Sequence, residues 1–197
     1  MPTTWQWLGR ADYRAVLADQ LAARERVWAG EPGVVLLCEH PPVITLGRSA
    51  TEANILDTGG IPVERVERGG QVTYHGPGQL MVYPIVRLRS VVGFLERVAA
   101  VIAETCAALG VPGAAWRREP AGVWLGGRKL AACGIHVARG VSVHGFALDV
   151  DTPPHAWGGI RPCGLDVRPI SLAEVLGAPI AVEHVARELG PRLAAAV

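Results

Sequence analysis

The alternation of two helical periods with short apolar runs constrains the fold of this chain more than any other feature. Apolar side chains recur at helical spacing over residues 12–29 and 91–109, with Asp12 as a candidate N-cap and Gly30 and Gly110 as stops. Shorter apolar runs, typical of strands, lie at 34–38, 43–46, 71–75, 80–86 and 122–125. Helices alternating with strands predict a mixed α/β fold.

Turn residues indicate how some of these segments connect. Pro41-Pro42 separates the runs at 34–38 and 43–46, which predicts two short strands around a turn. Arg139-Gly140 separates the extended segments 129–138 and 141–150, and this spacing predicts a β-hairpin. At least part of the sheet is therefore expected to be antiparallel.

Local signals predict the remaining segments. Residues 50–62 and the stretch that begins at Pro153-Pro154 have no apolar period and are expected to be irregular. Ser171-Leu172-Ala173-Glu174 fits a capping box at the start of a short helix. An Ala-rich helix over 183–196 is expected to be interrupted near Gly190-Pro191.

Composition excludes several classes of protein. The chain has 197 residues and a net charge of +1, without the basic excess of a nucleic-acid binder. With 50% apolar and 19% charged residues it is not a disordered chain. No apolar run approaches a membrane span, and the first residues lack the segments of a signal peptide. We expect one domain over residues 1–197, with no nucleic-acid or membrane partner.

The spacing of the cysteines and histidines limits what redox state and metal binding can be expected. The four cysteines are widely spaced, which favours reduced thiols in the cytoplasm. No pair of histidines or cysteines has the spacing of metal ligands, so no metal is expected. His75 and His144 lie in Gly-rich polar contexts, where either can orient a substrate or hydrogen-bond the core. His40 precedes two prolines and can hold a turn.

The basic residues are divided unevenly, because 18 are arginine and Lys129 is the only lysine. Biased codon usage explains arginine elsewhere, and one surviving lysine can be chance. Arginine keeps its proton in proteins, however, whereas lysine can release one when its surroundings favour the neutral amine. A site that needs an amine able to give up a proton would also explain Lys129.

Residues 68–79 resist an explanation by packing alone. The segment contains four glycines and a proline, which let a ligand approach the backbone closely. Arg68, Thr73, Tyr74 and His75 supply polar groups around that backbone. The spacing matches neither a dinucleotide fingerprint nor a P-loop. A ligand-binding loop and a pair of ordinary turns around one strand therefore both remain open.

Cys163 differs from the cysteines in apolar patterns. Cys38 and Cys106 are interpreted as packing residues. Cys163 lies between Pro162 and Gly164 in an irregular segment, where a thiol can be presented to a ligand. Its reactivity would depend on its pKa, because the thiolate is the nucleophile.

Lys129 opens an extended segment of small residues that leave room beside the backbone. A cationic neighbour lowers the pKa of a thiol, but separation in sequence does not say whether Lys129 contacts Cys163. A solvated strand end is the alternative for Lys129, and a small core residue is the alternative for Cys133.

Four blocks of the sequence resemble the lipoyl(octanoyl) transferase family, whose fold is that of biotin and lipoate protein ligases. The blocks are Glu39 to Arg48; Arg68 to Gln79 with Tyr83-Pro84; Gly122 to Trp124 with Arg128, Lys129 and Gly134; and His144 to Leu148 with Arg161 to Gly164. They span about residues 39–176, and the Arg-Gly-Gly to His-Gly-Pro-Gly-Gln block is highly specific. The lysine–cysteine pair distinguishes this family from its relatives.

The resemblance implies a fold and a reaction. The fold would be α/β of the α+β type, with a mixed, largely antiparallel sheet flanked by helices and a smaller second sheet. The reaction would transfer an octanoyl group from octanoyl-acyl carrier protein to a specific lysine of lipoyl domains, without a cofactor. The acceptors would be the E2 subunits of 2-oxoacid dehydrogenases and the H protein of glycine cleavage.

The resemblance also assigns site residues by motif position. Cys163 would carry the octanoyl group as a thioester, and Lys129 would lower the pKa of that thiol. The residues expected to line the acyl substrate are Arg68, Gly69, Gly70, Gln71, Val72, Thr73, Tyr74, His75, Ala132, Cys133, Gly134, Gly145, Phe146 and Ala147.

The chain departs from the family pattern at three positions. Cys133 stands where a branched aliphatic residue is usual, which places a second thiol beside the expected acyl site. Asp149 replaces a common Asn, and Ile170 replaces a common Thr. None of the three is the expected lysine or cysteine, so the departures concern the local surroundings more than the reaction.

Three other functions compete with this interpretation. An ATP-dependent lipoate or biotin ligase of the same fold would leave Cys163 unexplained, and the sequence has no Gly-Arg-Gly-Arg adenylate loop. An amidotransferase that moves octanoyl between two lipoyl domains shares the cysteine. A catalytically silent module that binds lipoylated partners is disfavoured, because both Lys129 and Cys163 are present.

Overall fold

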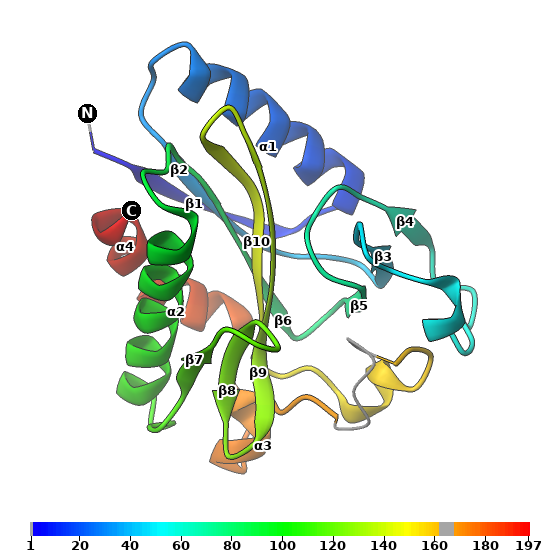
Figure 1. Ribbon diagram of the computed structural model, residues 1–197. Helices are drawn as coiled ribbons and strands as arrows, with labels where there is room; N and C mark the ends of the chain where they lie inside the picture. The colour runs from blue at the N-terminus through cyan, green and yellow to red at the C-terminus, as the bar shows by residue number, and fades with distance from the viewer. Residues whose placement is uncertain (1, 162–167) are drawn as a thin grey trace.

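The computed structural model describes residues 2–161 and 168–197 and shows helices flanking a large sheet, with a small sheet beside it (Figure 1). Its strands are β1 (Thr4–Arg10), β2 (Val34–Glu39), β3 (Val43–Leu46), β4 (Val63–Arg65), β5 (Val72–His75), β6 (Gln79–Ile85), β7 (Ala115–Arg117), β8 (Gly122–Leu125), β9 (Arg128–Ala138) and β10 (Val141–Asp149).

The sheets have the arrangement that the sequence predicts. In the described residues the large sheet has seven strands in the order β1-β2-β6-β10-β9-β8-β7, and the small sheet has three in the order β4-β3-β5. The β1–β2 and β3–β4 pairs are parallel and the remaining pairs are antiparallel. The expectation of a mixed, largely antiparallel sheet beside a smaller one is confirmed.

Helices cover both faces of the large sheet (Figure 1). They are α1 (Tyr13–Trp28), α2 (Val91–Ala108), α3 (Leu172–Leu176) and α4 (Val182–Ala196), with single 3-10 turns at Glu52–Asn54 and Pro154–Trp157. Side chains alternate along β2, so Val35 and Leu37 pack with α2 and α4 while Leu36 and Cys38 pack with α1. Cys106 of α2 is also buried, so the packing role expected for both cysteines is confirmed.

Local signals begin and end the helices where the sequence predicts. The side chain of Asp12 accepts a hydrogen bond from the Ala15 N–H at 3.0 Å, and Ser90 accepts one from the Gly93 N–H at 3.2 Å. Gly30 ends α1 with a φ of 99°, and its N–H donates to the Val27 carbonyl. These bonds satisfy backbone groups that a helix end leaves without intrahelical partners.

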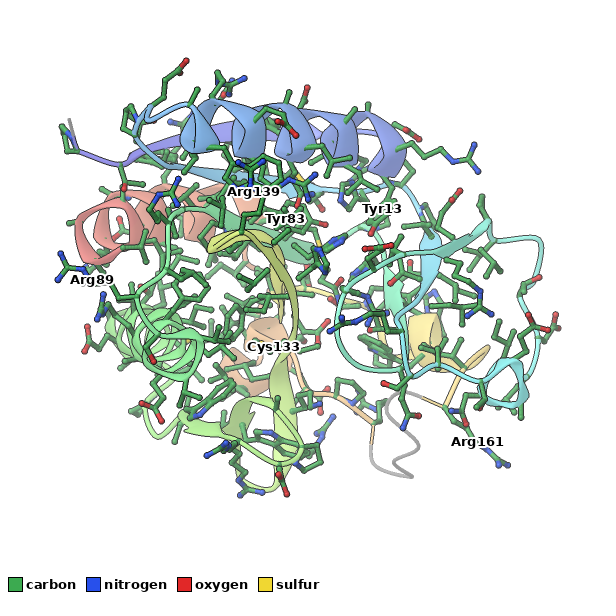
Figure 2. All side chains as sticks on the ribbon, turned by 45° about the horizontal axis from the view of Figure 1, so that its top comes forward. Tyr13, Tyr83, Arg89, Cys133, Arg139 and Arg161 are labelled. Carbon is green, nitrogen blue, oxygen red and sulfur yellow. The ribbon has the colours of Figure 1, made fainter. Side chains whose placement is uncertain are left out.

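The β9–β10 hairpin is also confirmed. Ala138 pairs with Val141 across a two-residue turn in which Arg139 has φ 47° and Gly140 has φ 76°. Positive φ at both turn positions matches the right-handed twist of the two strands. The Arg139 guanidinium lies 4.5 Å from the centre of the Trp28 ring, so the turn packs against the end of α1 (Figure 2).

The strands β2 and β3 are not partners around a turn, which corrects the prediction for 34–46. β2 belongs to the large sheet and β3 to the small one. Pro41 and Pro42 have no N–H to donate, so a ladder cannot continue across them. His40 holds this corner as expected, because its ring nitrogens contact the Ala11 carbonyl at 2.7 Å and the Tyr83 hydroxyl at 3.0 Å.

Helix α4 runs through Gly190-Pro191 without the predicted interruption. Proline removes one intrahelical hydrogen bond, but tertiary packing compensates here. Leu189 and Leu193 are both buried in the core, and Gly190 lies against the ring of Trp5. Across residues 2–161 and 168–197, no helix has the length and apolar character that crossing a membrane requires.

Candidate active site

A pocket with about 490 Å³ of empty space lies between the small sheet and the β9–β10 hairpin. Every lining residue that the resemblance predicts borders it, except Gly69 and Tyr74. Lys129 and His144 line it too, as do Tyr13, Met81 and Tyr83. Figure 2 shows Tyr13, Tyr83 and Cys133 reaching this region from α1, β6 and β9.

Gly69 and Tyr74 have other contacts. The Gly69 N–H donates to the Ile135 carbonyl at 3.0 Å and so joins the 68–71 loop to β9. Tyr74 lies between Thr73 and His75 on β5, and its ring packs edge-on against Trp157 at 5.8 Å between centroids. Because neighbouring side chains of a strand point to opposite faces, Tyr74 packs into the core of the small sheet.

Arg68 organises one wall of the pocket. Its buried guanidinium donates to the Thr45 hydroxyl from Nε at 3.1 Å and from Nη2 at 2.8 Å. It also donates to the carbonyls of Thr45, Gly69 and Gln71 at 2.7 to 3.0 Å. A planar fork of donors thereby holds the 68–71 loop closed around itself. The glycines of this segment let the loop fold back, as Gly70 has φ 84°.

His75 is engaged at both ring nitrogens. Nε2 lies 3.2 Å from the Thr45 hydroxyl, and Nδ1 lies 2.8 Å from the side-chain oxygen of Gln79. Burial first, and then the positive charge of Arg68, lower the pKa of His75 to about 3. The imidazole is therefore neutral at physiological pH, and the structure favours the core hydrogen-bonding interpretation over a free acid–base group.

His144 reaches the pocket from a strained backbone. It has φ 61°, which is uncommon for a residue other than glycine. The buried side chain of Gln20 in α1 accepts the His144 N–H at 2.8 Å and holds this conformation. Burial and the charge of Arg68 lower the pKa of His144 to about 4, so its ring presents neutral polar atoms to the pocket wall.

Lys129 is buried at the pocket wall, with 8% of its surface exposed, so the alternative of a solvated strand end is wrong. The β8–β9 register pairs Lys129 with Trp124, and Nζ lies 5.2 Å from the centre of that ring. The face of an indole ring attracts a cation. The pocket, the pairing and the ring together hold the only lysine of the chain at one defined place.

Cys133 lines the pocket next to Gly134 and also packs against the main hydrophobic core, so it has the core position that was its alternative. Burial raises the pKa of the Cys133 thiol to about 12, although the charge of Lys129 acts in the opposite direction. The thiol is therefore protonated at neutral pH and is a poor nucleophile. Its role in this geometry is to occupy space at the wall.

Cys163, with Pro162 and Gly164, lies outside the described residues. The described chain reaches Arg161, whose N–H donates to the Asn54 carbonyl at 2.9 Å, and Figure 2 shows Arg161 beside the small sheet. On the other side, the Ile170 N–H donates to the Lys129 carbonyl at 2.9 Å. Residues 168–170, where the described chain resumes, are thus bonded through Ile170 to the strand that carries Lys129.

Arg128 anchors the same segment. Its guanidinium donates to the carbonyls of Arg168 and Pro169 at 3.2 and 2.7 Å. Both Arg128 and Arg168 bind the Glu174 carboxylate, and these bonds lower its pKa to about 2. The N–H of Glu174 meanwhile donates to Ser171 at 3.2 Å, which confirms the predicted N-cap of α3. A motif arginine without a predicted role is therefore a structural anchor.

Sequence reasoning missed three pocket residues for different reasons. Tyr83 belongs to the Tyr-Pro pair of a recognised block, so a signal existed without a role attached to it. Tyr13 is the first residue of α1 and Met81 lies inside β6, where neither interrupts a regular pattern. Only the packing of α1 over β6 shows that these two side chains reach the pocket.

Solved structures define the class of fold. The described residues superpose on a lipoate-protein ligase A structure bound with ATP, with a TM-score of 0.83. The two chains are 14% identical, and the match covers 98% of this chain and 84% of that one. The large sheet with helices on both faces and the adjoining small sheet are therefore the fold of a lipoate-protein ligase catalytic domain.

Sequence relatives identify the family. The model of the lipoyl protein ligase A/B catalytic domain matches residues 12–194. An octanoyltransferase of Gloeobacter violaceus is 44% identical over 93% of this chain and 79% of its own length. One of Geobacter metallireducens is 42% identical over 94% and 89%. The chain belongs to this ligase-fold family and, within it, to the octanoyltransferases, acyltransferases that move an octanoyl group in protein lipoylation.

Proposed function

We propose that the chain takes octanoyl from octanoyl-acyl carrier protein as a thioester on Cys163 and passes it to a specific lysine of lipoyl domains. The acceptors would be the E2 subunits of 2-oxoacid dehydrogenases and the H protein of glycine cleavage. The observation that carries the proposal is Lys129. It is the only lysine of the chain, it is buried at the wall of the pocket, and its carbonyl accepts the N–H of Ile170.

The chemistry has two balanced steps. The Cys163 thiolate attacks the thioester carbonyl carbon of the donor, and the thiolate of the carrier leaves. The amine of the acceptor lysine then attacks the new thioester, an amide forms and the Cys163 thiolate leaves. Thiol–thioester exchange is nearly balanced in energy, so the enzyme supplies a thiolate and positioning rather than a driving force. The donor is already activated, and the proposal includes no cofactor.

Lys129 would serve both steps. As an ammonium near Cys163 it would lower the pKa of that thiol and favour the thiolate. As a neutral amine it would accept the proton that the acceptor lysine loses on forming the amide. An arginine at this position would keep its proton and could perform only the first task. Backbone N–H groups near Gly164 would bind the oxyanion of each tetrahedral intermediate.

The wall of the pocket suits an alkyl chain. Phe146 and Ala147 from β10 and Met81 from β6 supply apolar surface, and Gly134 and Gly145 leave space beside it. The match of the family model over 12–194 supports one catalytic domain over residues 1–197. A cytoplasmic location is part of the proposal, and the free thiols of Cys38, Cys106 and Cys133 support it.

The test is an intact mass after incubation with octanoyl-acyl carrier protein in the absence of ATP. We expect an octanoyl adduct that Cys163→Ala abolishes and that an added lipoyl domain removes. Cys133→Ala is the matched control, because it deletes the other pocket thiol and should retain the adduct. An adduct that survives Cys163→Ala would overturn the assigned nucleophile.

The same assay separates the competing functions. Modification of a lipoyl domain by free octanoate only when ATP is added would identify a ligase. Transfer only from an already octanoylated lipoyl domain, with no reaction of the carrier thioester, would identify an amidotransferase. A protein that binds a lipoylated domain but forms no adduct under any of these conditions would be a silent binding module.

A further inference from the structure

A continuous series of hydrogen bonds connects the two sheets behind the pocket. It runs from Arg68 to the Thr45 hydroxyl, from there to His75 and on to the Gln79 amide, and it ends at the Asp149 carboxylate. Thr45 and His75 belong to the small sheet, whereas Gln79 and Asp149 are a cross-strand pair of the large sheet. Three of these residues have no part in the proposed reaction and are buried polar groups that need another explanation.

The arginine end of this series determines the direction of the bonds. A guanidinium only donates, so Thr45 Oγ1 accepts from Arg68 and keeps its own proton for another partner. His75 Nε2, 3.2 Å away, is the partner in place, so it accepts and carries no proton. The proton of the neutral imidazole is then on Nδ1, which donates to the Gln79 side-chain oxygen at 2.8 Å.

The aspartate end is consistent with the same direction. The Gln79 amide nitrogen donates to Asp149 Oδ1 at 2.9 Å, and this oxygen can accept whether the carboxyl is ionised or carries a proton on its other oxygen. The amide oxygen of Gln79 is thereby turned toward His75 and accepts the Nδ1 proton. The arginine end therefore places the imidazole proton on Nδ1, and the bond from Gln79 to Asp149 agrees with it.

We infer that Gln79 and Asp149 are positioning residues of the acyl pocket, which hold His75 in the Nδ1-protonated tautomer and thereby direct the Thr45 hydroxyl and Arg68. The inference rests on the proposed function only for the identity of the ligand in the pocket. The 68–71 loop closes around the Arg68 guanidinium. If His75 carried its proton on Nε2 instead, Thr45 could not donate to it, Arg68 would lose its fixed position and the pocket wall that this loop forms would loosen. Asp149 needs only to accept one hydrogen bond, and an amide oxygen would serve equally.

The Gly76-Pro77-Gly78 turn makes the connection possible. It joins β5 of the small sheet to β6 of the large one and brings His75 and Gln79 into contact. Gly78 has φ 87°, and a Cβ there would overlap the Asp151 backbone. The glycines of this motif therefore permit a turn tight enough for the imidazole of one sheet to meet the amide of the other.

The direct test is the ¹⁵N spectrum of the His75 ring in the otherwise unaltered protein, assigned with a His75→Gln variant. We expect the proton on Nδ1 and an unprotonated Nε2 from pH 6 to 8. A proton on Nε2, or a rapid mixture of tautomers, would overturn the inference. This result does not depend on octanoyl transfer, so it stands apart from any failure of the proposed function.

Variants then test the link to the pocket. Gln79→Met removes the acceptor of the His75 Nδ1 proton and should populate the tautomer with the proton on Nε2. We expect KM for octanoyl-acyl carrier protein to rise about tenfold and kcat to stay within about twofold, as for the loss of one hydrogen bond that positions Arg68. Asp149→Asn, the conservative variant that retains an acceptor oxygen, should keep the His75 tautomer of the wild type. Equal KM values for Gln79→Met and the wild type, or a changed tautomer in Asp149→Asn, would contradict the assignment.

Two threonines provide a matched control. Thr45 and Thr105 are both fully buried, and Thr105 donates only to the Val101 carbonyl within α2. Thr45→Val should shift the His75 signals and raise KM, whereas Thr105→Val should alter neither. If both variants shift KM equally, the effect is one of general stability and the positioning role is wrong.

Discussion

The two walls of the pocket hold their shape in different ways. The polar wall, formed by Arg68 and His75 beside the small sheet, depends on the hydrogen bonds that both side chains make with Thr45. The small-residue wall is formed by Cys133, Gly134 and Gly145 on β9 and β10. Its shape depends on the small size of these residues, which leave space that larger side chains would fill. Substitutions in the polar wall should have graded effects, whereas one methyl group added at a glycine of the small-residue wall should disrupt it.

The largest effect is expected at Gly145. A Cβ there would overlap the Val82 carbonyl on the neighbouring strand, and backbone in the middle of a sheet cannot move aside. Gly145→Ala should lower the free energy of unfolding by about 3 kcal/mol or more, measured by denaturant titration. Gly93→Ala on α2 is the control, because its nearest neighbour would be Ser90 at 3.5 Å. If the two variants unfold at the same denaturant midpoint, a Cβ at Gly145 is tolerated and the small-residue wall does not depend on this glycine.

Arg68→Lys should have the next largest effect. A lysine ammonium has three donors and no planar fork, so it cannot replace the five hydrogen bonds that Arg68 makes to Thr45, Gly69 and Gln71. Each buried acceptor left without a donor costs about 1–3 kcal/mol. We expect a loss of about 2–4 kcal/mol in unfolding free energy.

Arg65→Lys is the matched control for this prediction. Arg65 is 59% exposed and pairs with Glu52 on the surface, so its replacement should change stability by less than about 0.5 kcal/mol. If the Arg68 and Arg65 variants unfold at the same denaturant concentration, the forked hydrogen bonds of the polar wall do not stabilise it.

Asp149→Asn should have a smaller effect that depends on pH. Burial raises the pKa of Asp149 to about 7 in the folded protein, whereas its ordinary value is 3.8. The folded state therefore holds a proton that the unfolded state releases between these values, and stability declines as the pH rises from about 4 to 7. The decline is at most about 1.4 kcal/mol per pH unit.

Removing this carboxyl group removes the decline. Asp149→Asn should be more stable than the wild type at pH 8 and equal to it near pH 4, as measured by thermal unfolding across the range. A stability difference that is the same at pH 4 and pH 8 would show that the carboxyl of Asp149 is not the titrating group.

The smallest effect is expected at Cys133. Cys133→Val adds one heavy atom to the small-residue wall and removes a protonated thiol, so stability should change by less than about 1.5 kcal/mol. The narrower pocket should shift the preference toward shorter acyl chains, measured by competition among carrier thioesters of different length. An unchanged chain-length profile would mean that the acyl chain does not contact this residue.

Local interactions explain which elements could be predicted from the sequence. Asp12, Ser90 and Ser171 each cap a helix through a residue three positions ahead. Arg139-Gly140 likewise forms its turn between two adjacent strands. These contacts lie within a few residues of each other, so the pattern of residue types is sufficient to predict them.

The three strands that the sequence did not predict all lie at sheet edges. β1 and β7 end the large sheet, and β4 ends the small one. Their residues are mostly exposed or half-buried, so they lack the apolar run that identifies an interior strand. An edge strand exists because a neighbouring strand offers free backbone groups. That neighbour is distant in the sequence for β1 and β4, whereas β7 pairs with β8, the next strand of the chain.

By itself, the sequence determined the helices, the hairpin and the residue types from which the pocket is built, Lys129 among them. Only the tertiary structure decided that Lys129 is buried against Trp124, that His75 is fully hydrogen-bonded and that Gly69 and Tyr74 do not border the pocket. Residue type and spacing encode local contacts, whereas burial and hydrogen-bond partners depend on which distant segments pack together.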